Sequence, residues 1–536
     1  MNIHAATQQT EADEEAILEL QIEDIEKQIR RTGQTPKKND ALRYKLNDLV
    51  RQYKQLNDES PHQKLKYPKT NQPISFADAL QMLQIGETVV PLQQDFSKSA
   101  FQFHDRDNQL SRVVTEVIAV NFAQRGTDNP HSFAMVPGGS GIGETRFGWE
   151  VAQLMSKSHF AGKVGENLEY GDIVTEYVYI DFKNSECFTE NFDSTEANSV
   201  RLGGRLAAKA LLSKPFKGLA AKHPSCTFLR KCTAHQVLRE IVARALEKVT
   251  EKKIVQLVLH MDEFQFFVDS FETPEKGREA LKNMLMEIRT FMAHEKPKTN
   301  SKPRFFIVPV LTGTAPYDLS FLTTHRINLV TIPLLPLTEE SSLSMFSAAY
   351  TDKYTSELIA EIASQDHFLI LLADTGYIPK YIVQLFDKDI KLSNKVPWSH
   401  YMEKIIVRKD KGVFGGSASA KVIIKLALSG QPVDSVFVLP CGKTVGDLER
   451  AGDLFLQRPR CDSERFHVCL PFIQLKAVAA MLFEFDGTQY FPPELLFYPT
   501  CVEDWTWLKF ELLHGHFHAI KTLSLKSNHS DHSLAT

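Results

Sequence analysis

Apolar residues near the start of the chain recur at steps of three and four residues, the spacing of helices that bury one face. The two runs are Leu18, Ile22, Ile25, Ile29 and Leu42, Leu46, Leu49, Tyr53. They predict two short heptad helices joined by a turn at 32–36. The helices pair either with each other or with a second chain. Both alternatives stay open, and 12–56 is the candidate segment for an unknown protein partner.

After a polar stretch at 59–73, short apolar runs alternate with segments that have one apolar helical face. The expected strands are 132–136, 174–182, 254–261, 305–311 and 327–332, and the expected helices include 145–155, 234–248 and 281–291. This alternation predicts an α/β fold with a parallel sheet. The expected organisation is a coiled hairpin over 1–60, a linker over 61–100, an α/β core over 101–335, a helical lid over 336–410 and a smaller α+β domain over 411–536.

The segment that follows the first expected strand, 136–146, has the glycine spacing of a phosphate-binding loop, G-x-x-x-x-G-K-[ST]. Gly138, Gly143 and Thr145 fit this motif, whereas Glu144 replaces the lysine that reaches the β and γ phosphates. A unit charge pair about 4 Å apart is worth about 4 kcal/mol at an effective dielectric of about 20, so this reversal weakens phosphate binding. The alternative is a glycine-rich turn that only joins a strand to a helix. The candidate nucleotide-binding residues are Gly138, Gly139, Ser140, Gly141, Gly143, Glu144, Thr145 and Arg146.

Two acidic residues, Asp262 and Glu263, end the expected strand at 254–261. In P-loop ATPases an aspartate at this place anchors Mg²⁺ together with the loop hydroxyl, here Thr145, and the next glutamate polarises the attacking water. A simple helix cap is the alternative for an isolated Asp-Glu pair. The strand at 305–311 ends in a Thr-Gly-Thr turn, where Thr312 or Thr314 is the candidate sensor of the γ-phosphate. A glycine-containing turn with a threonine cap is the equal alternative.

The ordered set GGSGIGET, LHMDEF, LTGTAP, IPLLPLT and GYIPK, over about 100–400, resembles the P-loop ATPase module of Crinkler effectors and the related retrotransposon hot spot proteins. The resemblance implies a three-layer α/β P-loop NTPase domain with a helical lid, and ATP with Mg²⁺ as cofactors. It also implies that Lys380, in GYIPK, occupies the second-sensor position.

Two departures from that family affect the expected activity. Glu144 replaces the loop lysine, and Arg146, two residues further along the helix, is expected to point away from the phosphates. An active ATPase in which Arg146 or Lys380 replaces the lysine stays open as an alternative. The family usually carries a C-terminal nuclease, but here 466–485 and 492–513 resemble only the segment that leads into it, with Glu511 as a candidate first acidic residue. The Leu-Phe-Leu-Ala-Lys type of export header is also not present. We therefore expect weak ATP binding with slow or no hydrolysis, and no nuclease activity.

Composition narrows the classes of partner. The net charge is −4, so contact with nucleic acid would require a local basic patch such as 214–231. That run lacks interleaved aromatic residues for stacking on bases, so a solvated insertion is its default interpretation. No run approaches the roughly eighteen apolar residues of a membrane span. We expect a protein of the cytoplasm or nucleus or, if an effector, one secreted into a host cell. The open alternatives are a weak nucleotide binder, an active ATPase and a non-enzymatic interaction scaffold.

Overall fold

The computed structural model divides into two compact units, 1–73 and 74–536. The described residues all belong to the second unit. They are 75–84, 105–138, 141–156, 172–184, 186–222, 228–295, 302–313, 326–351, 354–365, 375–385, 416–451, 454–457 and 465–471, with a few single residues or pairs between these ranges. The predicted hairpin at 12–56, Gly139, Ser140, Thr314 and the C-terminal segment with Glu511 lie outside them.

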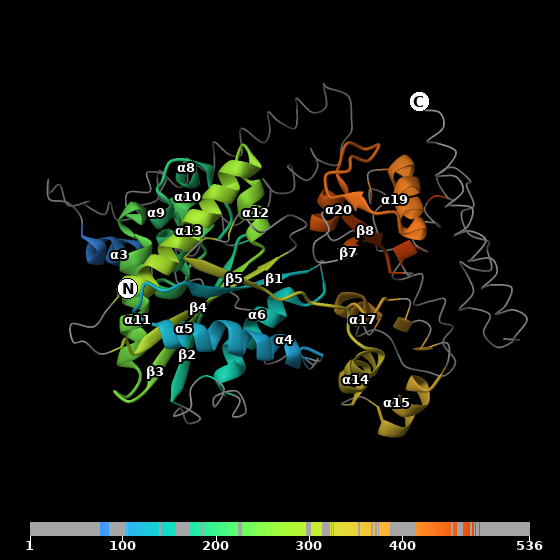
Figure 1. Cartoon of the computed structure of the whole chain (residues 1–536), viewed down its shortest axis with the longest axis horizontal. Helices are drawn as coiled ribbons and strands as arrows, with labels where there is room; N and C mark the ends of the chain where they lie inside the picture. Colours follow the sequence, from blue (N-terminus) through green and yellow to red (C-terminus); the bar gives the residue numbers. More distant parts are fainter. Residues whose placement is uncertain are drawn as a thin grey trace, which may run out of the picture. The chain divides into compact units, whose positions relative to one another are not determined.

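The centre of this unit is a five-stranded parallel sheet with the order β2-β3-β4-β1-β5 (Figure 1). The strands are β1 (His131–Pro137), β2 (Ile173–Asp181), β3 (Ile254–Asp262), β4 (Phe305–Gly313) and β5 (Ile327–Thr331). All five strands predicted from the apolar runs are present. Every residue of β4 is buried, because a central parallel strand is covered on both faces and therefore consists almost entirely of apolar residues.

Alternate residues of one strand enter two different cores. In β1, Phe133 and Met135 belong to one core, and Ala134 and Val136 to the other, because successive side chains of a strand point to opposite faces. The first core is covered by α3 (Phe76–Gln84), α9 (Asn198–Leu206), α11 (Ala234–Glu247), α12 (Phe264–Asp269) and α13 (Pro274–His294). The second is covered by α4 (Asp107–Arg112), the π-helix η2 (Val113–Ile118) and α6 (Glu144–Gln153).

This arrangement has three layers, with helices on both faces of the sheet and a glycine loop between β1 and α6. It is an α/β P-loop NTPase fold, as the sequence predicts. Each fully buried Val, Leu, Ile or Phe side chain contributes roughly 1.5–3 kcal/mol relative to an exposed one. The packing of the sheet against both helical layers is therefore the main source of stability in this part of the chain.

Two further groups of elements follow the sheet. The first contains α14 (Glu339–Tyr350), α15 (Ser356–Ala363) and α17 (Pro379–Leu385), and α14 and α15 share an apolar core around Phe346. The second contains α19 (Ser417–Ser429), α20 (Val445–Ala451) and a sheet with the order β6-β8-β7. Its strands are Val433–Asp434 (β6), Phe455–Gln457 (β7) and Arg465–Cys469 (β8), paired antiparallel. The predicted lid and C-terminal domain boundaries stay predictions.

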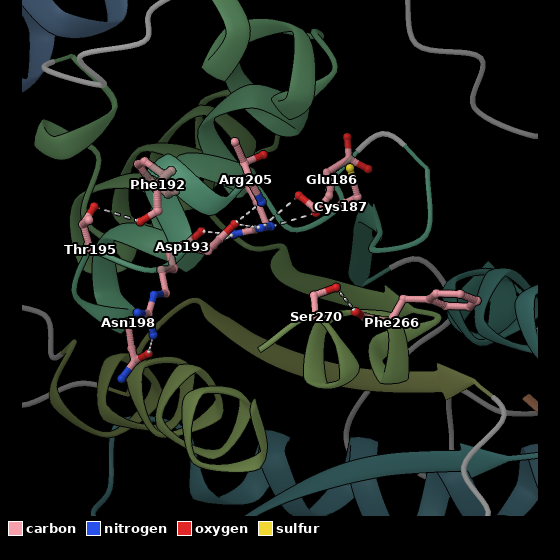
Figure 2. A network of polar contacts seen from close by, with 11 residues as sticks. Glu186, Cys187, Phe192, Asp193, Thr195, Asn198, Arg205, Phe266 and Ser270 are labelled. Atoms are coloured by element: carbon pink, nitrogen blue, oxygen red, sulfur yellow. Dashed lines mark hydrogen bonds and ion pairs between the residues drawn. The ribbon is translucent and has the colours of Figure 1, made fainter. Parts of the chain in front are cut away.

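A buried ion pair fastens the helices that follow β2. Arg205 of α9 donates from both terminal nitrogens to Asp193, at 2.7 Å each, and from Nε to the Glu186 carbonyl at 2.8 Å (Figure 2). Neither side chain of the pair is exposed. The guanidinium also lies 4.6 Å from the centroid of the Phe216 ring. With both carboxylate oxygens engaged, the pair fixes α9 on α8 (Glu190–Asp193) and on the turn after β2.

Candidate functional site

The candidate site lies where four parallel strands end. The strand register pairs Asp181 of β2 with Asp262 of β3, and Asp262 with Thr312 of β4. Thr312 in turn pairs with Val136 of β1, two residues before Gly138. Because parallel strands present their carboxyl ends at one edge of the sheet, this register brings the loop, the acidic pair and the threonine together, although the sequence separates them widely.

The glycine loop requires its glycines for conformation and for close contact. Gly141 and Gly143 have φ values of +91° and +104°, a region in which residues with a Cβ are strained. A Cβ on Gly138 would lie 2.6 Å from Oε1 of Glu144. The Glu144 side chain therefore folds back against Gly138 at the start of the loop.

Glu144 is buried, with 9% of its surface exposed. Its Oε1 has no hydrogen-bond partner among the described residues. Burial raises the pKa of this carboxyl well above its usual value, and the charges of Glu263 and Asp262 raise it further. Burial and the neighbouring carboxylates thus favour the neutral acid at residue 144 over the carboxylate.

Asp262 is the hydrogen-bond centre of the site. Its Oδ2 accepts from the Thr145 hydroxyl at 2.7 Å and from the Tyr179 hydroxyl at 2.8 Å. Its Oδ1 accepts from the Thr312 hydroxyl at 2.5 Å. Asp262 is buried, so an isolated carboxylate would be costly here, and three hydroxyl donors offset that cost.

His260 lies two residues before Asp262 on the same face of β3. Its Nε2 is 2.6 Å from Thr312 Oγ1, and its Nδ1 is 2.7 Å from the Tyr177 hydroxyl. The ring is fully buried, and burial lowers the pKa of His260 to about 4, although Asp262 acts in the opposite direction. His260 is therefore a neutral imidazole at physiological pH, with one donor nitrogen and one acceptor nitrogen.

Glu263 has a backbone conformation that is rare for residues other than glycine. Its φ and ψ are 54° and 38°, and its N–H donates to the Thr312 carbonyl at 2.8 Å. Its side chain contacts Gln265, and Lys183 Nζ lies 3.5 Å from its Oε1. Burial raises the pKa of Glu263, whereas Lys183 lowers it. Left-handed backbone at a non-glycine residue is strained and often accompanies functional sites.

The two candidate replacement cations lie differently. Arg146 pairs with Glu150, one turn further along α6, at 2.8 Å, and its guanidinium carbon lies 5.1 Å from the centroid of the Trp149 ring. Lys380 of α17 contacts the loop itself. Its backbone N–H donates to the Gly141 carbonyl at 3.1 Å, and a Cβ on Gly141 would lie 2.4 Å from the Cβ of Lys380.

Sequence reasoning missed four residues of this region, namely Tyr177, Tyr179, His260 and Arg106. The buried Arg106 donates to the Leu335 carbonyl at 2.6 Å and to the Ile142 carbonyl of the loop at 3.5 Å. Of these four, only His260 could have been found from the sequence. It lies two residues before Asp262 on the same expected strand, and residues two apart on a strand share a face. The tyrosines depend on the register of β2 against β3, which the sequence does not specify.

The residues at this edge fit a magnesium–nucleotide complex better than a metal held by protein alone. Thr145 and Asp262 supply hard oxygen ligands, and Mg²⁺ usually combines one or two carboxylates with waters and substrate phosphates. Within the described part of the chain, no group of three His, Cys, Asp or Glu side chains is placed to hold a metal ion. Thr145 and Asp262 would therefore hold Mg²⁺, which would neutralise charge on the phosphates.

Two other expectations from the sequence concern a basic patch and a membrane span. Within the basic run at 214–231, Lys214 is buried and donates to the Leu83 carbonyl at 3.1 Å, and Arg230 pairs with Glu196. Part of that run is therefore structural, which disfavours a basic patch made of all its residues. Among the described residues, no helix combines the length and apolar composition of a membrane-spanning segment.

No protein-family model and no curated protein matches this sequence. Several solved structures are similar. The Aeropyrum pernix ORC2 protein, in ADPNP–ADP complexes, has a TM-score of 0.34 and 10% identity over 72% of this chain and 96% of that one. The Aeropyrum pernix ORC1 protein in complex with DNA has a TM-score of 0.29 and 12% identity over 72% and 93%. A signal transduction ATPase with a tetratricopeptide repeat sensor from Pyrococcus horikoshii has a TM-score of 0.23 and 12% identity over 76% and 46%.

Proposed function

We propose that this chain is a Crinkler-like P-loop protein that binds ATP weakly and hydrolyses it slowly or not at all. Thr145 and Asp262 hold the Mg²⁺, and the backbone of the 138–143 loop receives the phosphates. Glu263 is placed to orient water, but the loop lacks the lysine that stabilises the β and γ phosphates. The site therefore keeps the residues proposed to hold the metal and lacks one of the groups that bind the phosphates.

The observation that carries this proposal is the position of Glu144. Its buried carboxyl group folds over Gly138, so phosphate must displace it or accept a hydrogen bond from its acid form. Displacement exposes a buried side chain, and ionisation places a negative charge beside phosphate. Either course weakens nucleotide binding without destroying the loop.

Calorimetry with MgATP tests the proposal on the full chain and on Glu144→Lys and Glu144→Gln. We expect weak binding to the natural protein and at least tenfold tighter binding to Glu144→Lys. Glu144→Gln separates the effect of the charge at residue 144 on MgATP affinity from the effect of its side-chain size, because the amide has the size of the neutral acid and carries no charge. Similar binding by the natural protein and by Glu144→Gln indicates a neutral acid, and clearly tighter binding to Glu144→Gln indicates a carboxylate.

Glu240→Lys is the matched control, because it makes the same change in net charge on α11, where Glu240 pairs with Arg244. We expect its affinity for MgATP to equal that of the natural protein. If neither the natural protein nor Glu144→Lys binds MgATP, the proposal is wrong. A non-enzymatic scaffold that recruits a protein through 12–56 would then be the remaining hypothesis.

The contact between Lys380 and Gly141 favours a second candidate function. In this candidate the protein is an active ATPase, and the ammonium group of Lys380, from α17, binds the phosphates in place of the loop lysine. Phosphate release measures it directly. We expect turnover to disappear in Glu263→Gln and to fall strongly in Lys380→Ala. Turnover that survives Glu263→Gln unchanged would come from a contaminating enzyme and would exclude this candidate.

A further inference from the structure

The contacts around Thr312 define which groups donate and which accept. Thr312 donates its hydroxyl proton to Asp262 Oδ1 across the 2.5 Å contact, and a hydroxyl has only one proton to give. Thr312 Oγ1 can then only accept across its 2.6 Å contact with His260, so Nε2 of the ring donates to it. In the tautomer with its proton on Nε2, Nδ1 carries a lone pair, and the Tyr177 hydroxyl, 2.7 Å away, is placed to donate to it. The hydrogen bonds therefore run in one direction, from Tyr177 through His260 and Thr312 to Asp262.

We infer that His260 and Tyr177 are positioning residues of the loop site, which fix the Thr312 hydroxyl as a donor to Asp262 and so orient the carboxylate that serves the metal of a bound nucleotide. This inference rests on the proposed function for its last step. The chain crosses β2, β3 and β4, whose spacing is set by the backbone ladder. Groups behind a ligating carboxylate commonly set its orientation in this way.

Packing alone does not explain these side chains. His260 and Thr312 are fully buried, and an apolar pair of similar size would fill the space without any requirement for partners. A buried polar chain is stable only when each member is satisfied. Here both ring nitrogens of His260 have a partner, and Gly148 of α6 leaves the room that the ring needs.

The inference changes the role proposed for Thr312. Phosphate oxygens accept hydrogen bonds, so a residue that senses the γ-phosphate must donate to it. The Thr312 proton is already directed to Asp262, and the remaining lone pair of the hydroxyl cannot donate. Thr312 therefore acts on Asp262 and through it on the metal, while a phosphate contact requires another donor.

Nuclear magnetic resonance of the full-length protein labelled with ¹⁵N-histidine tests the direction of these hydrogen bonds without any ligand. The His260 signals are those lost in His260→Gln. We expect the proton on Nε2 and a hydrogen-bonded, unprotonated Nδ1, whose signal moves in Tyr177→Phe while the Nε2 signal stays. Tyr177→Phe removes only the hydroxyl that contacts Nδ1, so the signal that moves in this variant identifies His260 even if His260→Gln does not fold. A proton on Nδ1, or an Nδ1 signal that does not move in Tyr177→Phe, overturns the inference.

The second measurement compares ATP binding with and without Mg²⁺ by calorimetry, in the Glu144→Lys background where binding is expected to be tight. We expect Tyr177→Phe to reduce the gain that Mg²⁺ provides by roughly tenfold, with metal-free ATP binding unchanged. Tyr350→Phe, in α14, is the matched control and should keep the full gain. An equal gain in all three proteins overturns the positioning role. If none of these proteins binds ATP, the proposed function fails. The His260 tautomer then decides by itself whether the hydrogen bonds run in the inferred direction.

Discussion

Gly148 of α6 and His260 of β3 are packed so closely that a side chain at 148 requires the ring or the helix to shift. A Cβ on Gly148 would lie 2.2 Å from Cε1 and 2.4 Å from Nε2 of the His260 ring. Glycine in the middle of a helix is otherwise unfavourable by about 1 kcal/mol relative to alanine. The contact explains why α6 contains a glycine directly above the hydrogen-bond chain that ends at Asp262.

We therefore expect Gly148→Ala to destabilise the protein by about 1–3 kcal/mol, because the ring and the helix must move apart. Gly218→Ala is the control, since Gly218 also lies in a helix but a Cβ there meets nothing within 4 Å. It should be neutral or slightly stabilising. Urea denaturation of both variants measures this, and a second change, His260→Ser, should restore part of the loss in Gly148→Ala. Equal effects at 148 and 218 would contradict the packing argument.

The buried pair of Arg205 and Asp193 should be costly to break. Asp193→Ala leaves a guanidinium in the core with no carboxylate, and such losses typically amount to about 3–5 kcal/mol. Arg230 and Glu196 provide the comparison, because Arg230 is half exposed, and Arg230→Ala should cost at most about 1 kcal/mol. Thermal unfolding of the two variants ranks them. Similar midpoints would show that the buried pair is replaceable.

His131, at the start of β1, makes stability depend on pH. Burial lowers its pKa to about 4, and the charge of Arg289 contributes to the shift. The unfolded chain, with an ordinary pKa near 6.5, binds the proton first as the pH falls. His131 therefore reduces stability from about pH 6.5 down to about pH 4, by at most about 1.4 kcal/mol per pH unit.

Denaturation midpoints at several pH values between 4.5 and 7, roughly the window set by these two values, test this expectation. His131→Phe keeps an aromatic ring and removes the titrating group, so its stability should fall less steeply with decreasing pH. His294→Gln, at an exposed position in the last turn of α13, should keep the slope of the natural protein. Parallel curves for the natural protein and His131→Phe would show that His131 does not contribute.

Two thiols should differ sharply in reactivity. Burial raises the pKa of Cys232 to about 12, whereas a hydrogen bond from Ser419 and nearby backbone groups lower the pKa of Cys441. The thiolate is the form that reacts with iodoacetamide. Peptide mapping after brief labelling at pH 7.5 should find Cys441 modified and Cys232 unmodified, and Cys232 should react only after denaturation. Early labelling of Cys232 would mean that α9 and α11 open readily.

Several features of the fold were predictable because they depend on local patterns. The five apolar runs became strands at the expected places, since a strand buried on both faces needs an almost continuous apolar segment. The glycine motif between β1 and α6 was also visible, because positive φ values at Gly141 and Gly143 require glycine. The replacement of lysine by Glu144 was equally evident.

The ionisation state of Glu144 and the partners of Asp262 were not predictable in the same way. The sequence determined the strands, the loop and the order of the acidic residues, because these follow from residue type and short-range spacing. The hydrogen-bond chain of Tyr177, His260 and Thr312 follows from the register of three strands that are far apart in sequence, so it becomes visible only in the folded protein. The tertiary structure also decided that Glu144 is buried beside two other carboxyl groups, because burial and charge interactions arise from distances in space.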